Sequence, residues 1–169
     1  VHFILGEFEA AMSDYSKSTS LDDTFIFSQV QHAVASYKLG NIARSTAEFC
    51  RILKKFSDSS ESYNYFGELM LDQQRHEDAV ANFDKSIALE QAKPKGKYVL
   101  PMINKALVLF QWKQDLTGAE QLCRDALRID PDCDVAIATL AQLSLQQSKI
   151  PEAIEYLSLI HISEPTRLR

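Results

Sequence analysis

Residues Asp78 to Glu90 read Asp-Ala-Val-Ala-Asn-Phe-Asp-Lys-Ser-Ile-Ala-Leu-Glu, and this stretch decides the fold of the chain. Its apolar residues fall on one stripe of a 3.6-residue period, which is typical of an amphipathic helix. The centre of that stripe is a small residue, Ala79, followed four positions later by an aromatic residue, Phe83. The stretch therefore predicts a helix that packs closely against a neighbour at Ala79.

The same pair of positions recurs along the whole chain. At five places a small residue is followed four positions later by a larger one: Ala11 with Tyr15, Ser45 with Phe49, Ala79 with Phe83, Ala119 with Cys123, and Ala153 with Leu157. Successive small residues are 34, 34, 40 and 34 positions apart. A period of 34 residues with this pattern resembles the tetratricopeptide repeat (TPR) family. The resemblance implies an all-α fold, a right-handed TPR solenoid of antiparallel helix pairs.

The repeat phase divides the chain into units. We expect a TPR array over residues 1–157, with a truncated first repeat at 1–23 and further repeats at about 24–58, 59–91, 98–131 and 132–157. The extra six residues, 92–97, predict a loop insertion, either an inert surface loop or a lid at one mouth of the groove. Residues 158–169 carry β-branched residues and a proline where a helix should continue, so we expect a non-native tail there. Because the chain opens in the middle of a repeat, we expect it to be a fragment.

Local signals mark several helix ends. Gly6 and Gly40 are 34 residues apart and should take the left-handed backbone at the turn between the two helices of a repeat. The polar run 57–60 should supply an N-cap for the helix that follows it. We also expect Asp130 as an N-cap and Pro131 in the first turn of the next helix.

Composition excludes several kinds of function. A net charge of -5 gives no general attraction to a phosphate backbone. Three cysteines without a Cys-x-x-Cys pair favour reduced thiols, and Cys123 should be a small core residue. Neither a phosphate-binding loop nor a metal-binding spacing is present in the sequence. We therefore predict a protein that is not an enzyme and that uses no cofactor and no metal.

Three acidic or histidine features have simpler explanations than catalysis. Glu68 and Asp72 lie one helical turn apart and could be paired carboxylates, but an acidic patch lining a groove is simpler. The alternating aspartates that begin at Asp130 lack the glycine of a calcium loop, so we interpret them as helix-cap residues. His32 should be a buried or half-buried histidine with a satisfied ring rather than a general base.

Longer strings of residues indicate a more specific resemblance within the TPR family. The strings are Phe-Gly-Glu-Leu-Met at 66–70, Phe-Asp-Lys-Ser-Ile-Ala-Leu-Glu at 83–90 and Leu-Ala-Gln-Leu-Ser-Leu-Gln-Gln at 140–147. With the 40-residue spacing, they resemble the C-terminal half of the fungal mitochondrial outer-membrane preprotein import receptors, the TPR receptor subunits of the TOM translocase. Members of that family have an N-terminal membrane anchor, a clamp for chaperone tails and a C-terminal array that receives preproteins.

The resemblance implies function and partners. We expect a preprotein receptor fragment that binds mitochondrial precursor segments in the concave groove, on the cytosolic face of the mitochondrial outer membrane. Its partners would be preproteins and other translocase subunits, with chaperones reached only through missing parts of the parent and no contact of this fragment with nucleic acid or membrane. The alternative is a TPR scaffold subunit of a multi-protein assembly with one fixed partner.

The repeat phase also predicts which residues line the groove. Asn64 and Asn104 occupy equivalent positions, but no Lys or Arg stands one turn away on the same face and Lys105 should face away, so a clamp for a C-terminal carboxylate is not expected. The mixture of apolar and acidic groups suits positively charged amphipathic clients. Packing between helices is the alternative role of the apolar members. The candidates are Phe27, Val30, Val34, Tyr37, Glu61, Asn64, Glu68, Leu71, Asn104, Val108 and Gln111.

Overall fold

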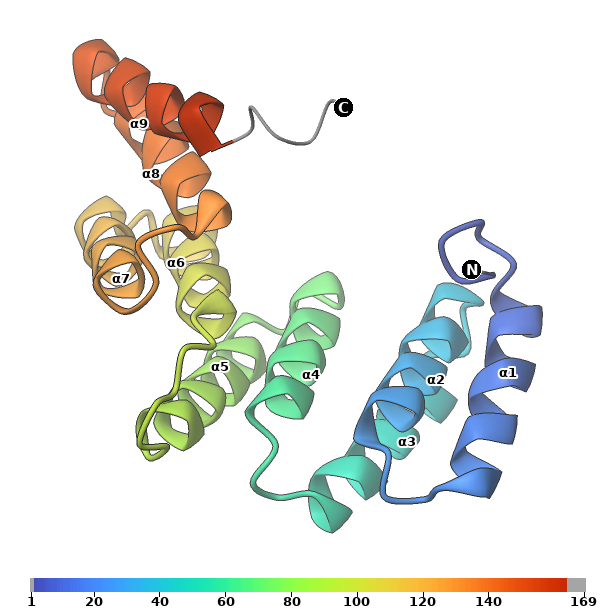
Figure 1. Cartoon of the computed structure of the whole chain (residues 1–169). Helices are drawn as coiled ribbons and strands as arrows, with labels where there is room; N and C mark the ends of the chain where they lie inside the picture. The colour runs from blue at the N-terminus through green and yellow to red at the C-terminus, as the bar shows by residue number, and fades with distance from the viewer. Residues whose placement is uncertain (1, 164–169) are drawn as a thin grey trace.

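The computed structural model describes residues 2–163, and within them the chain forms nine helices and no strand. The helices are α1 (Phe8–Leu21), α2 (Ile26–Lys38), α3 (Ile42–Lys55), α4 (Ser60–Asp72), α5 (His76–Gln91), α6 (Leu100–Lys113), α7 (Leu116–Ile129), α8 (Asp134–Gln146) and α9 (Ile150–Ser163). Each helix packs against the next one along the chain, apart from the looser junction between α3 and α4 (Figure 1). The all-α TPR fold predicted from the sequence is confirmed.

The helices divide into two layers. Contacts join α2 to α4, α4 to α6 and α6 to α8, and we call these four helices the inner layer. The others, α1, α3, α5, α7 and α9, form the outer layer, and within the described residues no two of them are in contact. Because only one layer has its helices close together, the array curves around that layer, as the ribbon shows (Figure 1).

The five small residues of the repeat lie where the outer-layer helices meet the inner layer. All of them are buried, with exposed fractions of 2% for Ala11 and 0% for Ser45, Ala79, Ala119 and Ala153. Ser45 also satisfies its hydroxyl, which donates to the carbonyl oxygen of Ala33 at 2.7 Å. A larger residue at any of these positions would push the layers apart, so the recurring small residue is explained by close approach between helices.

The larger member of each pair shows where the array ends. Phe49, Phe83 and Cys123 are completely buried, whereas Tyr15 is half-buried and Leu157 is exposed. The first three belong to α3, α5 and α7, each of which has a further repeat, truncated in the case of the first, on either side. Burial of this position therefore depends on the neighbouring repeats, as expected for a solenoid.

The turns that precede α1, α3, α5, α7 and α9 each contain one residue with positive φ at the equivalent position. Gly6 and Gly40 have φ values of 77° and 81°, which confirms the predicted left-handed conformation. The equivalent residues in the other repeats also have positive φ, although none is glycine: Gln74 at 61°, Gln114 at 55° and Ser148 at 59°. The sequence reasoning missed these three because it looked for glycine, while the 34- and 40-residue spacing would have found them.

Three helix ends test the predicted caps. Ser59 is the N-cap of α4 and accepts a hydrogen bond from the backbone of Ser62, which confirms the cap expected in the run 57–60. The prediction for Asp130 and Pro131 is wrong. Asp130 is the C-cap of α7, and α8 begins only at Asp134. A turn closed by a hydrogen bond from the Cys133 amide to the Asp130 carbonyl at 3.3 Å separates the two helices.

The predicted break at residue 158 is not observed. Helix α9 continues to Ser163, because β-branched residues weaken a helix only slightly and the first proline comes at position 165. Residues 164–169 lie outside the described residues, so the expectation of a non-native tail stays a prediction.

The 92–97 insertion is anchored to the end of α5. One carboxylate oxygen of Glu90 accepts hydrogen bonds from the backbone amides of Lys97 and Tyr98, at 3.1 and 3.2 Å. The other oxygen binds the Ser60 hydroxyl at 2.8 Å and the Lys93 ammonium at 2.6 Å. Glu90 thus fixes both sides of the insertion and sets where the chain enters α6.

Candidate functional site

A polar cluster joins two neighbouring helices of the inner layer. The Asn64 amide of α4 donates to Oε1 of Glu68, one turn further along the same helix, at 2.8 Å. The Asn104 amide of α6 donates to the same Glu68 oxygen at 2.8 Å and to Oδ1 of Asn64 at 3.0 Å. The equivalent positions of Asn64 and Asn104, predicted from the repeat phase, therefore lie against each other across the repeat boundary.

Two tyrosines flank this cluster. Tyr98, which the anchored insertion delivers, interacts with Asn64, and burial together with the nearby Glu68 raises its pKa well above the usual range. Tyr65 lies on α4 and hydrogen-bonds to Gln31 of α2, and burial followed by the Glu68 charge raises its pKa too. Both phenols therefore stay protonated and available as hydrogen-bond donors.

The Glu68 carboxyl has a raised pKa. The residue as a whole is exposed, but neighbouring groups take solvent away from its carboxyl, and this desolvation is the main cause. The neighbouring Asp72 adds to it, while the amides of Asn64 and Asn104 and the charge of Lys38 work in the opposite direction. A carboxylate that is held in place and incompletely solvated is an acceptor prepared for a basic partner.

The structure separates the eleven predicted groove residues by accessibility. Val30, Asn64 and Val108 are buried, with exposed fractions of 2%, 1% and 0%. These three cannot touch a client in this structure, so helix packing explains Val30 and Val108, and Asn64 orients its neighbours. The remaining eight reach the surface at least partly: Phe27, Glu61, Glu68 and Gln111 are exposed, and Val34, Tyr37, Leu71 and Asn104 are half-buried.

Basic residues are few near the cluster. Lys105 is directed away to the outer layer, where its ammonium pairs with Asp84 of α5 at 2.5 Å. Lys38 is the cation whose charge acts on Glu68, and it comes from the preceding inner-layer helix α2. The sequence reasoning missed Lys38, Tyr98 and Gln31 because it searched one helix at a time, whereas these residues reach the cluster across repeat boundaries.

Other candidates resolve into structural roles. His32 is half-buried, and its Nδ1 lies 2.9 Å from Oε2 of Glu48, which confirms the predicted satisfied histidine. Cys123 is buried, and burial raises the pKa of its thiol to about 12, as suits the core residue predicted for it. No group of three or more metal-binding side chains comes together among the described residues. In the same part of the chain, no helix is long and apolar enough to cross a membrane.

Comparison with known proteins agrees with the fold and shows which proteins are similar to this chain. The profile of the tetratricopeptide repeat family matches residues 113–167. The crystal structure of yeast Tom70 superimposes with a TM-score of 0.83 at 30% sequence identity, over 93% of this chain and 33% of that one. The Pseudomonas aeruginosa protein pilF superimposes with a TM-score of 0.76 at 18% identity, a likeness in fold alone.

Curated relatives are mitochondrial import receptor subunits. The subunit TOM70 of Mus musculus is 30% identical over 154 residues, which is 87% of this chain and 24% of that protein. The subunit TOM70 of Saccharomyces cerevisiae is 32% identical over 158 residues, 91% of this chain and 25% of that protein. The chain thus spans about a quarter of the length of these relatives.

Proposed function

We propose that this tetratricopeptide-repeat chain, similar over most of its length to TOM70 import receptor subunits, is the part of a mitochondrial preprotein receptor that holds client segments. The single observation that carries the proposal is the polar cluster on the inner layer, where Asn64 and Asn104 hold the Glu68 carboxylate. Its partners would be mitochondrial preproteins and other subunits of the translocase, at the cytosolic face of the mitochondrial outer membrane.

The client surface, as we define it, consists of the eight accessible candidates named above. Glu61 and Glu68 lie two turns apart on one face of α4, with Asp72 one turn beyond. Half-buried Val34 and Tyr37 of α2 and Leu71 of α4 supply apolar area beside these carboxylates. Such a surface suits a client segment with basic residues along one side and apolar residues along the other.

Apolar and charged contacts have different tasks in this proposal. An exposed ion pair contributes only about 0–1 kcal/mol, so affinity comes mainly from apolar contacts. The carboxylates and the net charge of -5 raise the rate of encounter with basic clients, and salt screens that effect.

A peptide array tests the proposal against a scaffold with one fixed partner. The chain is applied to basic amphipathic segments, to scrambled segments of equal composition, and to segments with Glu in place of Lys and Arg. Binding to many basic amphipathic segments and loss in both control sets supports the receptor. Failure to bind the basic amphipathic set, with one stable partner recovered by pull-down, would favour the scaffold.

A further inference from the structure

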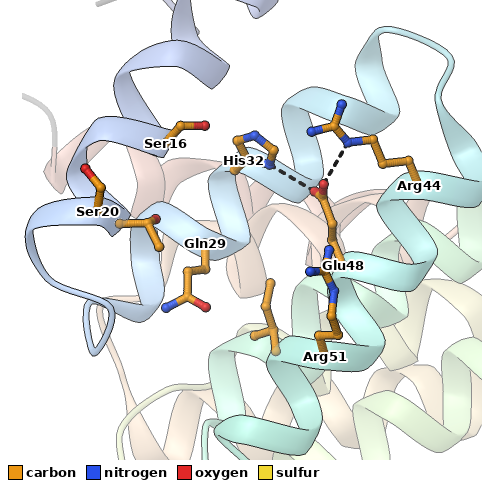
Figure 2. Close-up of a pocket in the computed structure, with 9 residues that line it drawn as sticks. Ser16, Ser20, Gln29, His32, Arg44, Glu48 and Arg51 are labelled. Atoms are coloured by element: carbon orange, nitrogen blue, oxygen red, sulfur yellow. Dashed lines mark hydrogen bonds and ion pairs between the residues drawn. The ribbon is translucent and has the colours of Figure 1, made fainter.

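A cavity of about 490 Å³ opens on the outer layer, and none of the residues that line it belongs to the client surface. It lies between α1 and α3, two outer-layer helices that are not in contact, and part of its wall comes from α2. Figure 2 shows residues of all three helices around it. Ser16, Thr19, Ser20, Gln29, His32, Arg44, Glu48, Arg51 and Ile52 line the cavity.

The cavity contains a network of side chains around the nearly buried carboxylate of Glu48. Oε2 of Glu48 lies 2.9 Å from Nδ1 of His32, and Oε1 of Glu48 lies 2.9 Å from Nε of Arg44. The Glu48 side chain is only 10% exposed, while that of Arg44 is 58% exposed. Glu48 thus pairs with Nε of Arg44 (Figure 2), and within the described residues the two terminal nitrogens of that guanidinium have no hydrogen-bond partner.

This network interrupts the repeat pattern. One period further on, the positions of His32 and Glu48 hold Phe66 and Asn82. In the last two repeats they hold Ala106 with Leu122 and Leu140 with Tyr156, all members of one apolar cluster. Because a buried ion pair is often no more stabilising than apolar residues of similar size, packing alone gives no reason for the substitution.

A second arginine remains without an internal partner. Arg51 is exposed at the cavity and forms no ion pair within the described part of the chain. The hydroxyls of Thr19 and Ser20 already donate to the backbone carbonyls of Tyr15 and Lys17, and the Gln29 amide donates to that of Asp23. The uncommitted donors are therefore mainly the two guanidinium groups, which match carboxylate and phosphate oxygens in geometry.

We propose that this cavity is a binding site for a small anion that presents carboxylate or phosphate oxygens to Arg44 and Arg51. Its volume is within the range of small-ligand sites. The Glu48 carboxylate holds Arg44 in place, so the group is preorganised before the anion arrives. The site and the proposed client surface share helix α2 but have no residue in common.

The test is a nuclear magnetic resonance titration of the 169-residue chain, with backbone amide signals as the readout. Citrate and inorganic phosphate are the two probes, each added at constant ionic strength against sodium chloride as the reference. We expect saturable shifts of amides in α1, α2 and α3 with at least one probe, and the stronger of the two identifies the oxyanion type.

Matched variants decide whether the arginines bind the anion. Arg51→Ala should weaken the binding at least tenfold, since a hydrogen bond to a charged group is lost. Arg51→Lys keeps the charge and should weaken it less. Lys85→Ala changes the equivalent exposed residue of the next repeat and should leave the binding unchanged.

Circular dichroism melting of each variant keeps folding separate from binding. Arg51 is exposed and has no partner in the described chain, so its variants should melt like the parent. Absence of saturable shifts with both probes would overturn the proposal, and so would equal weakening by Arg51→Ala and Lys85→Ala.

Discussion

The inner and outer layers of the array are built from the same repeat and have different surfaces. Inner-layer helices of successive repeats touch, so Asn104 can hydrogen-bond to Asn64 and Glu68 across a repeat boundary. Outer-layer helices stand apart, and the cavity between α1 and α3 holds its own charged network. Contact between inner-layer helices therefore joins polar residues of successive repeats, whereas the gap between outer-layer helices leaves room for a cavity, to which α2 also contributes Gln29 and His32.

The largest expected effect comes from forcing the layers apart. Ala119→Arg would place a guanidinium where the wild-type side chain is completely buried, and Ala79→Arg would do the same one repeat earlier. An unpaired buried charge with no room for the side chain should cost more than about 4 kcal/mol. Thermal melting followed by circular dichroism measures the loss, with Ala88→Arg, at an exposed position of α5, as the control.

Melting of both variants like the parent would mean that the repeat phase is wrong. The control should stay within about 0.5 kcal/mol of the parent, because it changes only the surface.

A smaller effect is expected from separating two inner-layer helices. Asn104→Ala removes the amide that donates to Oδ1 of Asn64, a residue that is only 1% exposed. Leaving a buried acceptor without this donor should cost about 1–3 kcal/mol of unfolding free energy. Chemical denaturation measures it. Gln111→Ala, at an exposed position of the same helix, should change stability far less, and equal effects of the two would contradict the bridging role of Asn104.

The turns that connect the layers should give opposite shifts of about 1 kcal/mol. Gly40→Ala places a side chain at a φ of 81°, with nothing within 4 Å of the added carbon, so the expected loss is purely conformational. Gln114→Gly removes a side chain from a left-handed position at a φ of 55° and should stabilise the chain. Melting temperatures of the two variants should move in opposite directions, and a shared direction would refute the backbone explanation.

The pH dependence of stability should distinguish Glu68 from Glu90. Desolvation of its carboxyl raises the folded-state pKa of Glu68, so ionisation weakens the fold as pH rises from the ordinary glutamate value, about 4.3, through the raised value. Although burial acts in the opposite direction, hydrogen bonds from Lys93, Ser60 and Tyr98 lower the pKa of Glu90. The stability from Glu90 is therefore present above the ordinary value and is lost as pH falls through the lowered one.

Urea unfolding at pH 3, 5 and 7 tests these signs. As pH rises, the free energy of unfolding of Glu68→Gln should increase relative to that of the parent. For Glu90→Gln, the free energy of unfolding relative to the parent should decrease over the same range. The same trend for both variants would show that the two carboxyls do not differ as described.

The sequence was informative wherever a feature repeats with the period of the fold. The spacing of Ala79 and its equivalents predicted the helix pairs and the close contacts between layers, because both are properties of every repeat. The left-handed Gln74, Gln114 and Ser148 follow the same spacing, although their residue types conceal it. The predicted break at residue 158 was wrong, because residues with weak helix propensity were taken as the end of a helix that continues to Ser163.

The candidate site was only partly predictable. The repeat phase placed Asn64 and Asn104 at equivalent positions, but it could not tell that Val30 and Val108 are buried, since burial depends on the packing of adjacent repeats. Tyr98 reaches the cluster through the 92–97 insertion, which has no counterpart in the period. To predict residues that reach the site across repeat boundaries, one needs the curvature of the array, and the sequence pattern of a single helix does not contain that information.

The most direct test of the account compares association kinetics of a basic amphipathic peptide with two neutralised variants. One variant carries Glu61→Gln with Glu68→Gln on the inner layer, and the other carries Glu77→Gln with Glu155→Gln at exposed positions of the outer layer. Both remove two negative charges, so any difference between them reports location rather than net charge. Circular dichroism confirms that each variant is folded.

At low salt, the inner-layer variant should associate several-fold more slowly than the parent, and the outer-layer variant should be nearly unchanged. At high salt the difference should disappear, because screening removes steering by the carboxylates. Equal association rates for the two variants at low salt would contradict the account, and the client surface would then have to lie elsewhere than the inner layer.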